Sequence, residues 1–177
     1  ASTSRVWRRV VAVAMAAALT AAAAKVAVPL PGIPVPFTLQ PVAVLLAGAL
    51  LGASGGFKSQ SIYLAAGMVG LPVFAAGGGW AYLLGPTGGY LLAFPVAAWI
   101  VGAFADRSRS ALSIAFGAVV GLAVIHLGGI AWLAALSGRE AAAAVGLAPF
   151  FVGDLLKVAL VTVIGAGFGG HVRRWIG

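Results

Sequence analysis

The chain has 177 residues, of which 62% are hydrophobic and 8% are charged, and it contains no cysteine. A soluble domain carries about 25% charged residues, so this composition and its long apolar runs predict an integral membrane protein. Disulfides, thiol catalysis and thiolate metal sites are excluded, and we expect no ATP-binding domain within the 177 residues.

Six apolar segments are predicted to cross the membrane as helices. A span needs about 20 apolar residues, and the length accommodates six spans and hardly more. The runs are continuous, which argues against a β-barrel with its alternating strands. We therefore expect an all-α protein with a single transmembrane domain, 1–177, and helices at 5–27, 41–54, 59–72, 90–105, 111–136 and 149–170.

The first segment has an arginine-rich start and an apolar run of small residues. A secretory signal peptide has the same outline, but this run is long enough to span, so we favour a helix. Small residues recur every four positions in two rows, Ala14, Ala18, Ala22 and Ala17, Ala21. Such rows let another helix approach closely. Alanine is also a common helix filler, but the scarcity of leucine favours a docking face for a partner protein.

The segment 28–41 is apolar and contains five prolines, which forbid a helix and favour extended backbone. We expect it to fold back over the protein and to line or cap a cavity, although a plain rigid connector fits the same composition. Phe37, Thr38 and Gln40 at its end are candidate ligand-binding residues.

A second candidate surface is the glycine-rich loop 75–90, which carries three aromatic rings, Trp80, Tyr82 and Tyr90. Amphipathic rings of this kind anchor a protein at the membrane interface or stack on a flat ligand. Three rings in one glycine-rich loop make a binding surface as good an interpretation as anchoring.

The last segment contains an acid and a base three residues apart, Asp154 and Lys157. Positions i and i+3 share one face of a helix. A charge at membrane depth costs about 2.5–3.5 kcal/mol on insertion scales, so such residues usually face a cavity or a partner. We favour a pair that binds a small polar ligand. The alternative is a structural ion pair that holds two helices together.

One histidine, His126, lies inside the fifth segment beside Gly128 and Gly129. An intramembrane histidine can belong to a proton relay. Because no second titratable group is near it in sequence, we favour a neutral histidine bonded to a backbone carbonyl.

The basic residues indicate the orientation. If the amino terminus is cytoplasmic, Lys25 and Arg139 lie outside, Lys157 lies in the membrane, and the inner side carries Arg5, Arg8, Arg9, Lys58, Arg107, Arg109, Arg173 and Arg174. This asymmetry follows the positive-inside rule for six helices with both termini inside, and it explains the net charge of +8 without nucleic acid. The segments 28–41 and 75–90 then share the outer side, at the mouth of an outward-opening cavity.

Four motifs resemble those of the BioY family, the biotin-binding S-components of energy-coupling-factor (ECF) vitamin importers. They are PVPFTLQ at 34–40, GLPVFA at 70–75, GPTGGYL at 85–91 and GDLLK at 153–157. The resemblance implies a six-helix S-component fold in the inner membrane of a prokaryote, with biotin captured from outside. It implies two kinds of partner besides the bilayer, a transmembrane coupling protein and two cytoplasmic ATPases, with no cofactor and with ATP used only by those ATPases. Some family members occur without a dedicated module, so an obligate partner is left open.

The resemblance also assigns residues. Asp154 and Lys157 take the biotin-contacting role, and the alanine row of the first helix takes the docking role. The ureido group of biotin has two N–H donors and one carbonyl acceptor, so a carboxylate and an ammonium can both form charge-assisted bonds with it. For the carboxylate of biotin, Lys25 or the N–H groups of 77–79 are weak candidates.

Two other functions are compatible with parts of this sequence. A self-sufficient small-solute or proton-coupled transporter would use His126 with Asp154 and Lys157, but six helices are few for alternating access and no inverted repeat is evident. An intramembrane enzyme using Asp154 usually needs a second carboxylate at depth, and we expect Asp106 and Glu140 in loops. We therefore expect no enzymatic activity.

Overall fold

The apolar runs form helices in the computed structural model, which describes residues 3–138, 142 and 150–177. Five helices are long and apolar enough to cross a membrane. The helices are α1 (Thr3–Lys25), α2 (Gln40–Met68), α3 (Trp80–Leu83), α4 (Gly88–Arg107), α5 (Ala111–Ser137) and α7 (Phe151–Ile176), and the strands are β1 (Ala27–Val28) and β2 (Phe37–Thr38). The expected segments 5–27, 90–105 and 111–136 agree with α1, α4 and α5 within a few residues, whereas α7 continues to Ile176 instead of ending at 170.

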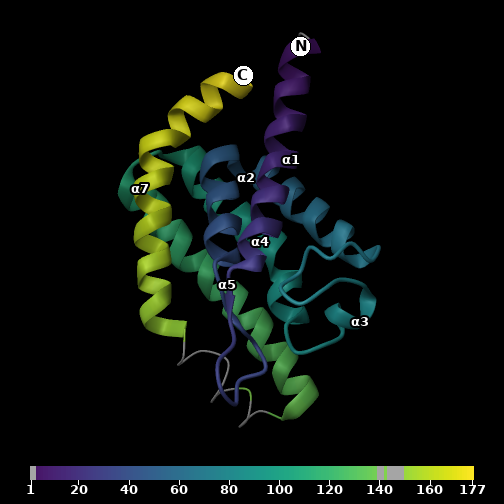
Figure 1. Ribbon diagram of the computed structural model, residues 1–177. Helices are drawn as coiled ribbons and strands as arrows, with labels where there is room; N and C mark the ends of the chain where they lie inside the picture. The colour runs from purple at the N-terminus through teal and green to yellow at the C-terminus, as the bar shows by residue number, and fades with distance from the viewer. Residues whose placement is uncertain (1–2, 139–141, 143–149) are drawn as a thin grey trace.

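The second and third predicted spans need correction. The structure has one element, α2, that is broken at Gly52 and not within 54–58, and it ends at Met68 instead of 72. Gly52 has φ 80° and ψ 177°, and an added Cβ would lie 2.6 Å from a carboxylate oxygen of Asp106, so only glycine fits there. The second arm folds back toward the start of the first (Figure 1). The side-chain amide of Gln40 donates to the Tyr63 hydroxyl at 2.7 Å and joins the two arms.

Asp106 holds the break in place. The first N–H groups of any helical arm have no partner within the helix. At the start of the second arm, the N–H of Ala53 donates to Asp106 Oδ2 at 3.0 Å, and Oδ1 of the same carboxylate pairs with Arg173. Asp106 therefore lies in the last turn of α4, not in a loop as expected, and it joins α2, α4 and α7.

Asp106→Ala is expected to lower stability, because it removes the cap of Ala53 and leaves Arg173 without this partner. Loss of one helix cap costs about 1–2 kcal/mol, which for a chain of this length lowers the unfolding temperature by roughly 2–8 °C. The measurement is thermal unfolding in detergent. Asp106→Asn keeps an acceptor oxygen and should lose less, so an Asp106→Ala protein as stable as wild type would contradict the capping role.

The proline-rich segment forms a short hairpin, which the sequence did not predict. β1 and β2 pair antiparallel, with Ala27 opposite Thr38 and Val28 opposite Phe37. The segment thus folds back as expected, and it connects the end of α1 to the start of α2. Next to it, Lys25 donates to the carbonyl of Phe74 at 2.7 Å and ties α1 to the loop before α3.

Helix α1 lies at the edge of the bundle. Over an apolar stretch of 18 residues in α1 only 11% of the residues are buried, against 67% over such a stretch in α4. Its two alanine rows lie side by side but differ in exposure: Ala17 is buried against the bundle, whereas Ala14, Ala18 and Ala22 are exposed. The start of α1 and the end of α7 lie at the same end of the molecule, where Arg8 donates to the carbonyl of Trp175 (Figure 1).

Candidate ligand-binding pocket

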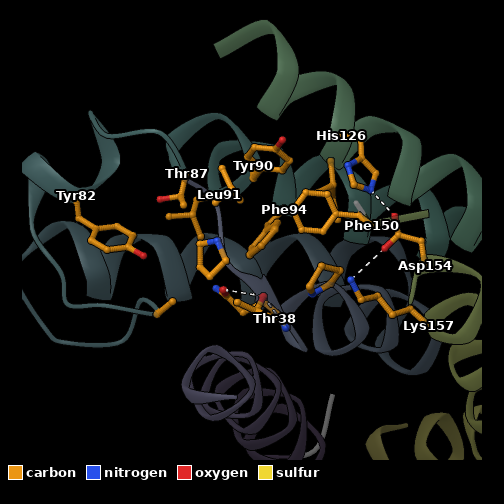
Figure 2. A pocket seen from close by; sticks show the side chains of 16 residues that line it. Thr38, Tyr82, Thr87, Tyr90, Leu91, Phe94, His126, Phe150, Asp154 and Lys157 are labelled. Atoms are coloured by element: carbon orange, nitrogen blue, oxygen red, sulfur yellow. Dashed lines mark hydrogen bonds and ion pairs between the residues drawn. The ribbon is translucent and has the colours of Figure 1, made fainter. Parts of the chain in front are cut away.

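A pocket lies at the other end of the bundle, beneath the hairpin and the loop around α3. Side chains from the hairpin, α4, α5 and α7 enclose it (Figure 2). Its lining consists of Val35, Pro36, Thr38, Gln40, Pro41, Ala75, Tyr82, Thr87, Tyr90, Leu91, Phe94, Ile125, His126, Phe150, Asp154 and Lys157.

The charged pair forms one end of this pocket. Asp154 lies in the first turn of α7, where the helix dipole favours a negative charge, and Lys157 follows one turn later. Lys157 Nζ lies 3.0 Å from Asp154 Oδ1, and both residues are buried. The Lys157 ammonium also lies 4.1 Å from the centroid of the Phe37 ring, a cation–π contact. Phe37 therefore contacts Lys157, but it is not one of the residues that line the pocket.

His126 completes the charged end, where it has a partner that the sequence-based expectation did not include. Its Nε2 lies 2.6 Å from Asp154 Oδ2, so the partner at this nitrogen is a carboxylate and not a backbone carbonyl. Asp154 is 28 residues further along the chain, which is why no titratable neighbour was visible in sequence. Three ionisable side chains from α5 and α7 therefore form one connected group.

The middle of the pocket is apolar and aromatic. Phe94 from α4 and Phe150, just before α7, lie between the charged end and the loop around α3 (Figure 2). The rings of Phe150 and Phe37 are stacked with centroids 6.2 Å apart. The ring of Tyr90 packs directly against Gly129, where an added Cβ would lie only 2.1 Å from the ring. Because Gly129 has no side chain, the Tyr90 ring can occupy this position beside the pocket. Such flat walls suit a planar or bicyclic apolar ligand.

A second polar end lies opposite the charged pair, where Thr87 and Tyr82 point into the pocket (Figure 2). Thr87 is the residue before the first turn of α4. Along one wall, Thr38 donates to the side-chain oxygen of Gln40 at 3.1 Å. Gln40 in turn donates to Tyr63, whose hydroxyl donates to the carbonyl of Val73 at 3.1 Å. This chain of bonds fastens the hairpin to the loop before α3.

Most of the sequence-predicted residues meet at the pocket: Asp154, Lys157, Tyr82, Tyr90, Thr38 and Gln40 line it. Trp80 does not line it and is 62% exposed. Lys25 and the glycines at 77–79 are also absent from the lining. Arg139 and Glu140 lie outside the described residues.

Sequence reasoning missed several lining residues, chiefly Thr87, Leu91, Phe94 and Phe150. The first three belong to the run that starts with the GPTGGYL motif, so their proximity to Tyr90 was a usable signal. Phe150 had none, because an aromatic residue at the start of an apolar segment is ordinary. Among the described residues, no group of three His, Cys, Asp or Glu side chains could hold a metal ion.

The pocket is narrow, with a volume of about 50 Å³. Small-molecule sites usually measure about 300–1,000 Å³. A ligand with a ring system therefore requires the covering hairpin, the loop around α3 or the aromatic side chains to move outward. The proline-rich hairpin and the glycine-rich loop are the segments placed to do so.

An all-helical, multi-pass membrane protein with an enclosed pocket, apolar in the middle and polar at both ends, has the features of a membrane-embedded solute-binding protein. The BioY family model matches residues 2–174, and the chain belongs to this family. It is 44% identical over 153 residues to a probable biotin transporter BioY of Pyrococcus horikoshii, covering 86% of this chain and 90% of that protein. It is 35% identical over 159 residues to the biotin transporter BioY of Thermotoga maritima, covering 89% and 93%.

A solved structure agrees with the fold. The crystal structure of the S-component for biotin from an ECF-type ABC transporter matches with a TM-score of 0.86 and 27% sequence identity. The match covers 94% of this chain and 93% of that one. The family and its curated relatives are transporters, in agreement with the expectation that this chain is not an enzyme.

Proposed function

We propose that this chain is the substrate-binding membrane subunit of an ECF importer and that its ligand is biotin. The observation that most directly supports this ligand is the buried pair of Asp154 and Lys157 at the end of an otherwise aromatic pocket. The names of the curated relatives and of the matching S-component support the same ligand.

The charged end complements a ureido group. A ureido N–H donates to the Asp154 carboxylate, and Lys157 donates to the ureido carbonyl oxygen. Both bonds are charge-assisted and about twice as strong as neutral ones. An analogue without these polar groups leaves both charges desolvated and poorly paired, so the site discriminates against it. The fused rings of biotin then lie among Phe94, Phe150 and Tyr90.

The carboxylate of biotin lies at the opposite end, near Thr87 and Tyr82. The first-turn N–H groups of a long helix such as α4 favour an anion, and the Thr87 hydroxyl adds a donor beside them. This assignment replaces Lys25, whose ammonium donates to the Phe74 carbonyl outside the pocket lining.

The topology is six crossing segments, with the two arms of α2 counted separately. The return of the second arm, which brings Tyr63 to Gln40, supports this count. The start of α1 lies beside the end of α7, as an even number of crossings requires, and the basic residues at that end include Arg8, Arg9, Lys58, Arg109 and Arg173. By the positive-inside rule both termini are cytoplasmic and the pocket opens outward, in the inner membrane of a prokaryote.

The partners are a transmembrane coupling protein and two cytoplasmic ATPases, which supply the energy that this chain lacks. Ala14, Ala18 and Ala22 form the docking face, since they are exposed on a helix that is barely buried in its own bundle. Exposed small residues in a membrane helix permit close approach of a second protein.

Calorimetric titration of biotin into the detergent-purified protein tests this function. We expect saturable binding, and much weaker binding of an analogue in which the ureido ring is absent but the valerate chain is kept. No heat of binding from a sample shown to be folded would overturn the ligand assignment. Biotin uptake by the lone protein in ATP-free proteoliposomes would instead indicate self-sufficient transport, which the contact between His126 and Asp154 makes worth testing.

A further inference from the structure

We infer that His126 is a positioning residue that fixes the Asp154 carboxylate in the orientation needed to accept a ligand N–H. This role rests on the proposed function, because it concerns how the same pocket recognises a ureido group. It differs from a ligand contact: His126 acts through Asp154.

Both oxygens of Asp154 are held by donors from the protein. Oδ2 lies 2.6 Å from His126 Nε2, and Oδ1 lies 3.0 Å from Lys157 Nζ (Figure 2). An ionised carboxylate offers about four acceptor positions, two on each oxygen. One position on each oxygen therefore remains for a ligand, and its direction depends on how the carboxylate is turned.

Lys157 alone does not fix the orientation of the Asp154 carboxylate well. It comes from the same helix as Asp154, one turn away, and its ammonium, which also contacts the Phe37 ring, is the group that a ligand carbonyl engages. Once a ligand carbonyl engages the ammonium, the lysine is drawn toward the ligand. His126 comes from the neighbouring helix α5 and remains as the second fixed point.

The imidazole ring is itself held in place. Its centroid lies 6.1 Å from that of Tyr90 in an edge-to-face arrangement and 5.8 Å from that of Phe150. Tyr90 is packed closely against Gly129, one turn further along α5 than His126. These two aromatic contacts limit the movement of the imidazole, and so of its Nε2 and of the Asp154 oxygen paired with it.

Histidine also suits the charge balance. An imidazole can donate a hydrogen bond to an acid–base pair without adding a permanent charge within the membrane. Because an ionised carboxylate only accepts hydrogen bonds, His126 can fix Asp154 in this way only when its Nε2 carries a proton. A lysine or arginine at the same place would supply the donor but leave an uncompensated positive charge.

The test compares His126→Leu, His126→Gln and wild type by titration with two ligands, biotin and the analogue without the ureido ring. Loss of one hydrogen bond to a charged group predicts that His126→Leu weakens biotin binding about 10- to 100-fold. Binding of the analogue should change less than about twofold, since it does not use the carboxylate. The Gln variant keeps an N–H donor and should recover most of the biotin affinity. His171→Leu, at an exposed position near the end of α7, is the matched control and should bind as wild type does.

The outcomes separate the two proposals. Wild-type binding that survives in His126→Leu overturns the positioning role and leaves the biotin assignment intact. An equal loss for both ligands, or no recovery with Gln, assigns His126 a structural role and also overturns the inference. If the wild type does not bind biotin, both fail.

A second measurement does not depend on the Leu variant folding. In the wild-type protein, ¹⁵N-histidine NMR is expected to show the Nε2–H tautomer at His126, with its resonance identified by loss in His126→Gln. The Asp154→Asn variant should shift that resonance. An Nδ1–H tautomer, or a His126 chemical shift that is unchanged in Asp154→Asn, would overturn the inference.

Discussion

Asp154→Asn is expected to reduce biotin binding by at least about 100-fold. The amide can present an N–H where the carboxylate presented an acceptor, and it no longer balances the buried Lys157 charge. Breaking a buried pair from one side typically costs about 3–5 kcal/mol, so part of the effect falls on stability. Calorimetry on the monodisperse protein, with thermal unfolding measured in parallel, separates the two contributions.

A double variant distinguishes recognition from structure. Asp154→Asn combined with Lys157→Met removes both charges, which relieves the desolvated lysine and should restore stability. Biotin binding should stay lost, because neither partner of the ureido group is present. The matched control is Asp106→Asn, the same substitution at the opposite end of the bundle, which should bind biotin normally. If the double variant binds biotin as the wild type does, the pair is structural and the ligand contacts lie elsewhere.

Ala18→Leu is expected to leave biotin binding unchanged and to lower module-dependent uptake by about fivefold or more. Ala18 is exposed on α1, so the added side chain meets nothing within this chain. In a closely packed interface, overpacking costs about 1–3 kcal/mol, which corresponds to a roughly 5- to 150-fold weaker association. The measurements are biotin titration on the isolated chain and ATP-dependent uptake in proteoliposomes that contain the coupling module.

The control for this experiment is Ala123→Leu, an exposed alanine in the middle of α5. It adds the same apolar volume to a helix outside the docking row and should leave both binding and uptake intact. Equal uptake by the Ala18→Leu protein and the wild type would show that the partner docks elsewhere. A parallel loss with Ala123→Leu would point to a general effect of added bulk.

The local features of this fold were predictable from sequence. The apolar runs specify helices because a segment in lipid must satisfy its backbone hydrogen bonds internally, and a helix does so within one segment. That Asp154 and Lys157 share one face was also predictable, because a spacing of three residues is decided within one turn of α7. The prolines likewise excluded a helix from 28–41 through the chemistry of single residues.

The break in α2 depended on a distant residue. Gly52, Gly55 and Gly56 were all able to interrupt the helix, and composition does not choose among them. Asp106, 53 residues further along the chain, caps Ala53 and so stabilises the break at Gly52. A cap supplied by another helix leaves no local pattern to detect.

By itself, the sequence determined that the chain is helical, membrane-spanning and equipped with one buried acid–base pair, because hydropathy, proline content and i+3 spacing act over a few residues. Only the tertiary structure decided which alanine row faces outward, that Trp80 lies outside the pocket and that His126 bonds to Asp154. These features depend on how α1, α4, α5 and α7 pack against one another. Packing brings together residues whose separation along the chain carries no periodic signal.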